Sequence, residues 1–483
     1  MLILKPLSRL VLALLVLLLV GCATRPVNPP ITRANDQTGY RFENRKPRGT
    51  GDENLLILAF SGGGMRAAAF SYGVLEFLAK TKVKGPQGNT VRLLDEVDII
   101  TGVSGGSFTA LAYGLYGDKL FQEYEKRFLK RDVQGELIAR FFSPRNWGDL
   151  WSLGWGRSEL AATLYDDILF NGATFKDLDE GHGPMILASA TDISTGSRFQ
   201  FTQRVFDQIC SDINAVSLSR AAAASSAVPV VLSPLTFNNY GGTCDNKIPS
   251  WMMPFADIEH PSRPAARAVR SLQNEKIFSD SKNRPYLHLI DGGVSDNIGM
   301  RGVLESLDII QALAGTGVAT PLDKAKRIIV FIVNSLSTPK TNWDKSESPP
   351  STLNVLLKAA GTPIDHFSFE AVEQLKDMSA QWDNLTLIRN SAALKANKDP
   401  KVAAAVRGPS AEIFVVDVSF PALKNETERD YLNQQPTSFV LPDEAVDRLR
   451  SAAGQIISDS PDFQRLLESV QVGIVPPAAA DSK

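Results

Sequence analysis

Val97-Asp98-Ile99-Ile100-Thr101-Gly102-Val103-Ser104-Gly105-Gly106-Ser107-Phe108 is the stretch that decides the fold. Its apolar start predicts a strand, and the residues from Ser107 onward predict a helix. Between them lies a G-x-S-x-G motif, which places a serine on a sharp turn where its neighbours two positions away must be small. Gly102 and Gly106 meet that need. We therefore interpret Ser104 as a candidate nucleophile, the alternative being a turn serine without chemistry.

The same order of strand and helix recurs along the chain. Strand-like apolar runs cover residues 55–60, 97–101, 185–190, 286–290, 327–333 and 412–418, and helix-like stretches cover 67–78 and 107–115. Such alternation predicts an α/β fold with a mainly parallel sheet covered by helices on both faces. A site is then expected at the carboxyl ends of the strands.

A second strand-to-helix junction carries Ser61-Gly62-Gly63-Gly64-Met65-Arg66. Three glycines allow a tight turn whose N–H groups lie at the positive end of a helix dipole, which suits a phosphate or an oxyanion. With Ala67 the segment also fits G-x-G-x-x-A, so a dinucleotide-binding turn is an alternative. The acidic residue expected about 20 positions further on is missing, which counts against that reading. A purely structural glycine turn is the third reading.

A serine nucleophile needs a proton acceptor, which is usually a histidine. Four histidines are available, and none is in a compelling context: His182, His260, His288 and His366. His288 lies in the apolar run 286–290, where period-two alternation turns it away from the direction of Asp291. Asp291 ends that run and enters the turn Gly292-Gly293, so it is the stronger candidate partner. A desolvated carboxylate can accept a serine proton directly.

Composition narrows the class of protein. The 483 residues carry 51 Lys and Arg against 53 Asp and Glu, and 43% are hydrophobic. Near-neutral charge without a long basic run argues against a nucleic-acid-binding protein. We find no repeat and no break in composition, so one large domain is expected despite the length.

The amino terminus is expected to be a lipoprotein signal peptide covering residues 1–21. Lys5 and Arg9 precede an apolar run that is too short to span a bilayer as a helix, and it ends in Leu19-Val20-Gly21-Cys22. This resembles a bacterial lipobox, which predicts acylation of Cys22; Ala23 after it favours the outer membrane of the cell envelope. The alternative is a signal or buried helix with an incidental cysteine. Residues 22–52 are polar and rich in proline and predict a flexible, solvated tether, and residues 474–483 a frayed tail.

Two other cysteines, Cys210 and Cys244, remain. In an oxidising compartment they are a disulfide candidate, and two unpaired core thiols are the alternative. No cysteine or histidine stands at metal-ligand spacing from another, so no metal site is expected.

Together, the three motifs resemble the markers of patatin-like phospholipases. They are Gly62-Gly63-Gly64-Met65-Arg66, Gly102-Val103-Ser104-Gly105-Gly106 and Asp291-Gly292-Gly293, in that order. Weaker matches are Ala190–Gly196 and Ala224–Pro229. The resemblance covers residues 53 to about 300, and less clearly to 335. Ala67 replaces the glycine that commonly ends the family's first motif, a change that a helix tolerates.

The resemblance implies a three-layer α/β/α fold and a serine acyl hydrolase acting on lipids through a Ser-Asp dyad. Ser104 would attack the ester carbonyl and Asp291 would accept its proton. The oxyanion hole would be formed by Gly62, Gly63 and Gly64, with Arg66 nearby as support. No cofactor is implied. We expect a catalytic domain over 53–335 and a further extension over 336–473 packed on it. A catalytically silent lipid-binding lipoprotein and a thioesterase or small-ester hydrolase are the alternatives.

Trp147, Trp151 and Trp155 are spaced by four residues and would form one stripe on a helix, although nearby glycines weaken that helix. Residues 251–255 (Trp-Met-Met-Pro-Phe) form a second apolar segment. Each is expected to be either a lipid-facing lid or a cap packed on the core.

Overall fold

The fold is taken from a computed structural model of the chain. It describes residues 24–45, 54–84, 90–150, 152, 155–247, 266–313, 325–397, 399, 402 and 411–469. The expected signal peptide with Cys22, the segment 251–255, His260, Trp151 and the tail 474–483 lie outside the described residues.

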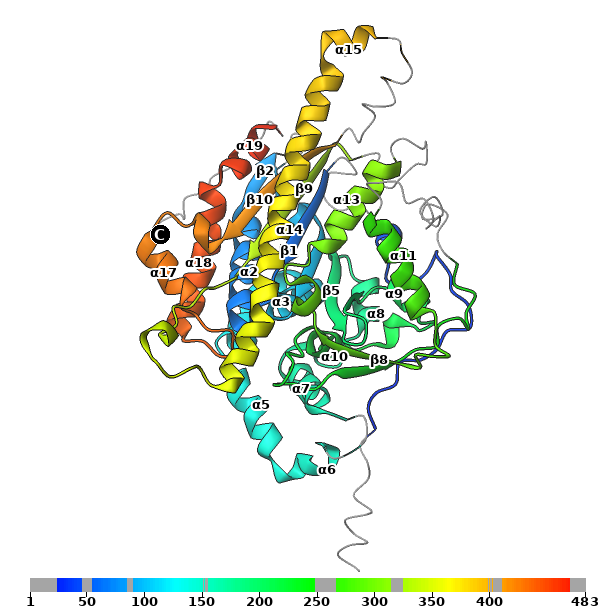
Figure 1. The fold of residues 1–483 in the computed structure, drawn as a ribbon, viewed down its shortest axis with the longest axis vertical. Coiled ribbons are helices and arrows are strands. Elements are labelled where there is room, and N and C mark those ends of the chain that lie inside the picture. Colours follow the sequence, from blue (N-terminus) through cyan, green and yellow to red (C-terminus); the bar gives the residue numbers. More distant parts are fainter. Residues whose placement is uncertain are drawn as a thin grey trace, which may run out of the picture.

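The centre of the molecule is a mixed, mostly parallel sheet with the strand order β10-β9-β1-β4-β5-β8-β7, and β6 pairs with β5 (Figure 1). Strands β10, β9, β1, β4 and β5 run parallel to their neighbours, whereas β8 runs antiparallel to β5 and β7 to β8. The strands are β1 (Asn54–Phe60), β2 (Lys82–Lys84), β3 (Thr90–Arg92), β4 (Val97–Val103), β5 (Met185–Asp192), β6 (Ser197–Gln200), β7 (Leu235–Asn238), β8 (Tyr286–Asp291), β9 (Arg327–Asn334) and β10 (Glu412–Ser419). The six strands predicted from the sequence are confirmed.

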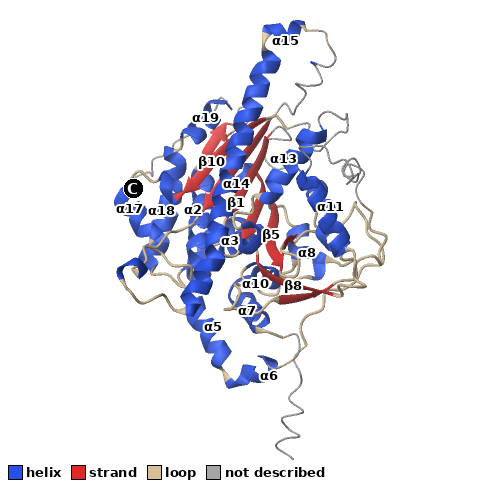
Figure 2. Cartoon of the chain, in the orientation of Figure 1, coloured by secondary structure: helices blue, strands red, loops and turns tan. Residues whose placement is uncertain are grey.

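Helices cover both faces of this sheet, as Figure 2 shows. The α-helices of the described residues are α2 (Gly64–Lys80), α3 (Gly105–Tyr116), α4 (Leu120–Tyr124), α5 (Val133–Phe142), α6 (Trp147–Leu150), α7 (Arg157–Tyr165), α8 (Phe175–Glu180), α9 (Gln203–Gln208), α10 (Leu218–Ser225), α11 (Ala266–Phe278), α12 (Gly293–Asp296), α13 (Arg301–Leu313), α14 (Thr352–Asn390), α15 (Ala392–Ala396), α17 (Glu426–Asn433), α18 (Asp443–Asp459) and α19 (Pro461–Ser469). The expected three-layer α/β/α architecture is confirmed.

Alternation within β1 shows how the layers form. Leu56, Leu58 and Phe60 face a core shared with α2, α3 and α18, while Leu55, Ile57 and Ala59 face a second core shared with α13 and α14. Both faces of the strand are buried, so its sequence is apolar at almost every position. For this reason the central strands could be recognised as uninterrupted apolar runs.

The segment after residue 335 is part of this body. It supplies the edge strand β10, and α18 packs against α2 beside the sheet. Gly73 of α2 permits close approach, because a Cβ there would lie 2.4 Å from the carbonyl oxygen of Arg450 on α18. Arg450 also forms an ion pair with Glu76 at 2.9 Å.

The described part of the expected tether, residues 24–45, differs from a solvated spacer. Tyr40 is fully buried and its hydroxyl accepts a hydrogen bond from the Ile186 N–H at 2.7 Å. Arg41 forms a buried ion pair with Asp207. Asn28 donates to the Ser211 Oγ at 2.8 Å and accepts from the Asn238 N–H at 2.8 Å. The polar side chains that suggested a linker instead dock the segment on the body of the fold through hydrogen bonds and an ion pair.

Cys210 and Cys244 form a disulfide with their Cα atoms 5.5 Å apart. The amino-terminal segment crosses this pair, because the Ile31 N–H donates to the Cys210 carbonyl at 2.8 Å and the Ala34 N–H to the Cys244 carbonyl at 2.9 Å. Within the described part of the chain, no helix has the length and apolar character needed to cross a membrane, and no cluster of His, Cys, Asp and Glu could hold a metal ion.

Candidate active site

Ser104 occupies the turn between β4 and α3 with φ 48° and ψ −120°, a strained conformation for a residue with a side chain. Its glycine neighbours are needed because of close backbone contacts. A Cβ on Gly102 would lie 2.7 Å from the Ser107 Cα, and one on Gly106 would lie 2.6 Å from the Ser61 carbonyl oxygen. A Cβ on Gly105 would lie only 2.0 Å from the Gly64 carbonyl oxygen. The serine turn and the glycine-rich turn are therefore packed directly together.

The structure brings Ser104 and Asp291 together. The Ser104 Oγ donates to the Asp291 Oδ2 at 2.9 Å. Asp291 ends β8, which runs antiparallel to β5, and the register pairs it with Ala190, next to the Ser189 that pairs with Val103 of β4. Because β8 runs antiparallel to β5, its direction alone does not bring its carboxyl end to the edge of the sheet that carries Ser104. The register does, because it pairs the carboxyl end of β8 with the carboxyl end of β5.

The turn Gly292-Gly293 holds the carboxylate of Asp291 in place. The Gly293 N–H donates to the Asp291 Oδ1 at 2.7 Å, so each carboxylate oxygen has one donor. Gly292 lies so close to β5 that a Cβ would be 2.3 Å from the Ser189 carbonyl oxygen. Both side chains are nearly buried, with Ser104 6% and Asp291 7% exposed.

Burial changes the acidity of this pair. Desolvation raises the pKa of Asp291 to about 6, and the hydrogen bonds from the Gly293 N–H and the Ser104 hydroxyl lower it in part. A carboxylate with such a pKa is mostly ionised at neutral pH, yet is more basic than an exposed aspartate. It is suited to accept and return a proton.

Ser225, at the end of α10, fixes the serine turn to the rest of the site. Its Oγ accepts a hydrogen bond from the Ser104 N–H at 2.9 Å and donates to the Ser189 carbonyl at 2.7 Å. Its carbonyl accepts the Gly292 N–H at 3.0 Å. One residue thus ties both turns together. Its only sequence signal was the weak match over Ala224–Pro229, which gave it no role.

The glycine-rich turn offers fewer free amides than the resemblance implied. The Gly62 N–H donates to the Asn297 carbonyl at 2.8 Å and the Met65 N–H to the Ser438 carbonyl at 2.7 Å. The assignment of Gly62 to an oxyanion hole is therefore corrected, because its amide is already used. The N–H groups of Gly63 and Gly64 have no acceptor among the residues that the structure describes. These two remain the candidate oxyanion donors.

Asn297 was not identified from the sequence, although it lies six positions after Asp291. Its carbonyl holds Gly62, and its side-chain oxygen fills the space next to two glycines. A Cβ added to Gly62 would lie 2.5 Å from the Asn297 Oδ1, and a Cβ added to Gly293 would lie 2.9 Å from it. Its Nδ2 donates to Ser368 of α14 at 3.4 Å. Asn297 therefore connects the aspartate turn, the glycine turn and α14.

Arg66 is 3% exposed, and its guanidinium donates to neutral acceptors. These are the Ser335 carbonyl at 2.7 Å, the Gln435 carbonyl at 2.8 Å and the Thr437 Oγ1 at 3.1 Å. Burial lowers its pKa to about 10, so it remains cationic at neutral pH. Through these bonds Arg66 joins the glycine turn to the loop after α17, far outside the motifs.

The amino ends of α2 and α3 meet at this point, because Gly64 and Gly105, their first residues, are in contact. Helix amino ends carry partial positive charge, and Arg66 adds a full one. The surroundings of Ser104 on this side are thus suited to an anion that forms on a bound ester.

The described histidines do not complete a triad. His288 is exposed and its Nδ1 lies 3.1 Å from the Thr236 Oγ1. His366 is exposed on α14. His182 precedes β5 and so lies at the amino edge of the parallel strands, opposite the edge that carries Ser104.

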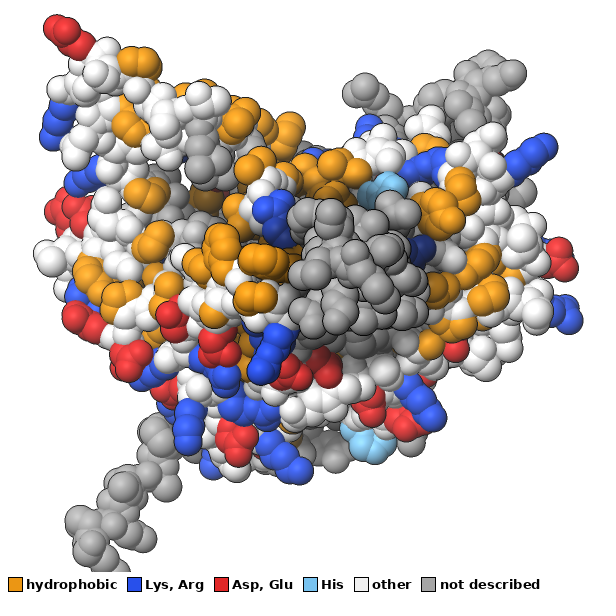
Figure 3. All heavy atoms as spheres, turned by 90° about the horizontal axis from the view of Figure 1, so that it is seen from below, with side chains coloured by type: hydrophobic (Ala, Val, Ile, Leu, Met, Phe, Trp, Pro, Cys, Tyr) orange, Lys and Arg blue, Asp and Glu red, His pale blue; other side chains and the backbone are white. Residues whose placement is uncertain are grey.

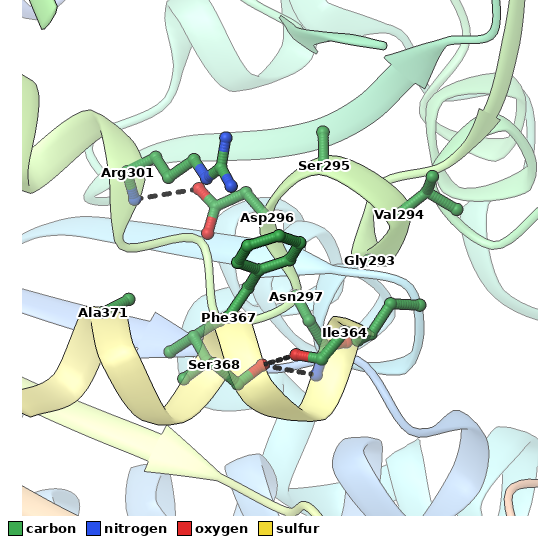
Figure 4. A pocket seen from close by; sticks show the side chains of 11 residues that line it. Gly293, Val294, Ser295, Asp296, Asn297, Arg301, Ile364, Phe367, Ser368 and Ala371 are labelled. Atoms are coloured by element: carbon green, nitrogen blue, oxygen red, sulfur yellow. Dashed lines mark hydrogen bonds between the residues drawn. The ribbon is translucent and has the colours of Figure 1, made fainter. Parts of the chain in front are cut away.

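A shallow pocket opens beside the aspartate turn, between α12 and α14 (Figure 4). Phe367 and Ile364 of α14 line it together with Val294 and Asn297. Phe367 is 58% exposed and Val294 41% exposed. Helix α14, which the sequence motifs did not reveal, thus forms one wall next to the candidate site.

The tryptophan stripe is only partly described. Trp147 begins α6 and is 54% exposed, whereas the Trp155 indole N–H is buried with no acceptor among the described residues. The two side chains therefore do not share one exposed face.

Comparisons with known proteins give one family. The model of the family described as patatin-like phospholipase matches residues 58–304. Human GIVD cytosolic phospholipase A2 is similar in structure, with 13% identity, a TM-score of 0.40, and coverage of 87% of this chain and 60% of that one. VipD from Legionella pneumophila has 12% identity and a TM-score of 0.28, with coverage of 92% and 71%. The chain thus spans about three fifths of the human phospholipase. No curated protein sequence matches it.

Proposed function

Since the chain belongs to the patatin-like phospholipase family, we propose that it is a lipid acyl hydrolase that works through a Ser104-Asp291 dyad. The observation that carries the proposal is the 2.9 Å hydrogen bond from the Ser104 Oγ to the Asp291 Oδ2 on a strained serine turn. Family membership supports the substrate class, which is fatty-acyl esters of lipids.

In the first half-reaction the Ser104 Oγ attacks the acyl carbonyl carbon while its proton passes to the Asp291 carboxylate. Collapse of the tetrahedral intermediate breaks the bond to the alcohol, which leaves with the proton from Asp291. Water then attacks the acyl-enzyme and gives its proton to Asp291. Release of the fatty acid returns that proton to Ser104. The raised pKa of Asp291 supports this role, because the carboxylate is ionised before each attack and basic enough to take the proton.

The N–H groups of Gly63 and Gly64 are proposed to bind the oxyanion, supported by the amino ends of α2 and α3 and by cationic Arg66. Loss of one such donor commonly raises the barrier by about 3 kcal/mol. Because the amides are preset by the turn, they need not reorganise as charge develops. The proposed steps use groups of the protein, the ester and water.

The test is labelling with a fluorophosphonate probe, together with release of fatty acid from phospholipid, lysophospholipid, triacylglycerol and short p-nitrophenyl esters. We expect wild type to be labelled and active, and Ser104→Ala to lose both. Labelling that persists in Ser104→Ala would place the nucleophile elsewhere. A folded wild type that neither reacts nor hydrolyses any of these esters would favour the silent lipid-binding lipoprotein. Thioester substrates in the same assay test the thioesterase alternative.

We further propose that the mature protein begins at Cys22, carries acyl chains there and is anchored in the bacterial outer membrane. The lipobox Leu19–Cys22 and Ala23 after it support this proposal. Incorporation of labelled palmitate that is lost in Cys22→Ser would support acylation, and recovery in inner-membrane fractions would refute the outer-membrane assignment.

A further inference from the structure

The docked amino-terminal segment limits where a lipid anchor can be. Thr24 is the first described residue, and Arg25 after it donates to the Thr236 carbonyl at 3.2 Å and lies over the Tyr286 ring. Since two residues span at most about 7 Å, Cys22 cannot lie further than that from Thr24. Acyl chains on Cys22 would therefore hold the body at the membrane directly rather than on a long tether.

The described chain begins below β8, at the lower end of the molecule in Figure 1, where α5 and α6 also lie. The arrows of the parallel strands point toward this end in Figure 1, and Ser104 follows the carboxyl end of β4. An anchor next to Thr24 would therefore orient the protein so that the edge of the sheet with the candidate active site faces the bilayer.

Large apolar side chains are exposed at this end. We name this group the lower apolar face, and it consists of Ile138, Phe142, Trp147, Val230 and Val231. Phe142 is 75% exposed, Val230 59% and Trp147 54%. The segments that carry these residues are neighbours. Helix α5 packs against α7, and Arg157 at the start of α7 donates to the Val230 carbonyl at 3.1 Å. Figure 3, seen from below, shows hydrophobic side chains gathered on this end, with most charged ones in the lower half of that view.

We propose that the lower apolar face docks on a lipid bilayer, and that the docked amino-terminal segment sets this orientation by holding the Cys22 acyl chains at the same end. Aromatic side chains favour the membrane interface, and each buried apolar side chain adds to the affinity. The inference rests on the proposed acylation and lipid substrate. It adds that the enzyme sits on its membrane with the carboxyl edge of the sheet facing the lipids.

Cross-linking tests the orientation without requiring catalysis. A photoreactive phenylalanine analogue is placed in turn at Phe142, Trp147 or Val231 in the full acylated chain carrying Ser104→Ala. The protein is reconstituted in vesicles of phosphatidylethanolamine and phosphatidylglycerol with a tritiated phospholipid. Leu387 is the matched control position, because it is 71% exposed and lies near the carboxyl end of α14, at the upper end of the molecule in Figure 1. We expect at least five times more lipid label at the three face positions. Equal label at Leu387, or cross-links to a protein instead of lipid, would overturn the proposal.

The role of the short anchor is tested by inserting 20 Gly and Ser residues between Ala23 and Thr24. Such a linker has a span of about 25 Å, so the body is released from the surface. Cross-linking of lipid at Phe142 should then fall several-fold. Unchanged cross-linking, or a Cys22 that carries no acyl group, would refute the part assigned to the anchor.

Comparing hydrolysis of vesicle phospholipid with hydrolysis of a soluble ester distinguishes a failure of the docking proposal from a failure of the proposed function. Phe142→Glu and Val231→Glu should lower hydrolysis of vesicle phospholipid at least tenfold and leave hydrolysis of a soluble short-chain ester within twofold, whereas Leu387→Glu should change neither. Variants that match wild type on vesicles would refute docking by this face. If wild type hydrolyses neither substrate, the proposed function fails, and the cross-linking result alone decides the docking proposal.

Discussion

Replacing Asp291 by Asn is expected to stabilise the protein at neutral pH while abolishing hydrolysis. The pKa of Asp291 is raised from 3.8 to about 6, mainly by burial. Between pH 3.8 and pH 6 the Asp291 carboxyl is already ionised in the unfolded chain, while in the folded chain it still holds its proton. Stability is therefore lost as pH rises through this window, and the loss is complete above the folded pKa. Because Asn cannot ionise, the variant does not lose this stability as the pH rises.

The magnitude follows from the size of the pKa shift. About two pKa units at 1.36 kcal/mol each give a loss of about 3 kcal/mol at pH 8, and about 1 kcal/mol at pH 4.5. Asn keeps an oxygen that can accept the Gly293 N–H. At about 2.1 cal/mol/K of unfolding entropy per residue, 3 kcal/mol corresponds to about 3 °C in the melting temperature of this chain.

The assay is thermal unfolding of wild type and Asp291→Asn at pH 4.5, 6 and 8, with fluorophosphonate labelling of the same samples. Ser104→Ala is the matched control, because it is inactive but retains the carboxylate and its pH-dependent loss. An Asp291→Asn melting temperature that is no higher than that of wild type at pH 8, or a gain that is equal at pH 4.5 and pH 8, would refute a desolvated carboxylate that ionises at a cost in stability.

Three further outcomes follow from the site and the disulfide. Because the proposed mechanism needs an ionised Asp291, whose pKa is about 6, kcat/KM on a soluble ester should rise about tenfold from pH 5 to pH 7 and level off above; a flat profile over this range would contradict Asp291 as the base. Replacing Cys210 and Cys244 together by Ser should lower the free energy of unfolding by about 3 to 4 kcal/mol, measured by urea unfolding, and no change would show that the disulfide does not restrict the unfolded chain. Gly105→Ala should lower kcat at least 100-fold because its Cβ would meet the Gly64 carbonyl oxygen at 2.0 Å. Gly361→Ala should be near wild type, because a Cβ there would meet no described residue outside its own helical turn within 4 Å; similar kcat values in both variants would contradict this packing.

The sheet could be predicted from the sequence because its central strands are buried on both faces. Their apolar runs, such as 327–333, are visible without any partner. β6 and β7 were missed because each has only four residues with alternate positions partly exposed. Short strands of this kind gain their definition from the neighbours they pair with, and the neighbours are distant in sequence.

The amino-terminal segment shows where composition misleads. Its polar and proline-rich sequence is typical of a linker, since it has no apolar periodicity. The segment is nevertheless docked, because Asn28 and Arg41 find buried partners near Ser211 and Asp207. Hydrogen-bonded docking of this kind depends on where the acceptors lie in space. Neither hydropathy nor spacing along the chain carries that information.

The candidate site was predictable at the level of the motif, and less so at the level of each amide. The motifs named Ser104 and Asp291, which lie in contact. They could not show that the Gly62 amide is used by Asn297, because this depends on a backbone contact between two turns. Glycine content alone indicates where a chain can turn tightly, and the contacts around it decide which amides remain free.

The geometry also explains how a serine could be activated without histidine. A base must stay desolvated to remain basic, whereas an oxyanion needs positive surroundings. In this fold the two needs are met by different elements: Asp291 is buried at the end of β8, while the amino ends of α2 and α3, which meet at Gly64 and Gly105, carry the positive charge together with Arg66 beside Gly63. Arg66 is a buried cation held by neutral acceptors, two of them in the loop after α17, where Gln435 and Thr437 accept from it. Because a buried cation is costly without its hydrogen bonds, the charge beside the glycine turn depends on a segment that lies outside the matched family region, residues 58–304. The proposed catalytic unit therefore includes the carboxyl-terminal part of the chain, through Gln435 and Thr437.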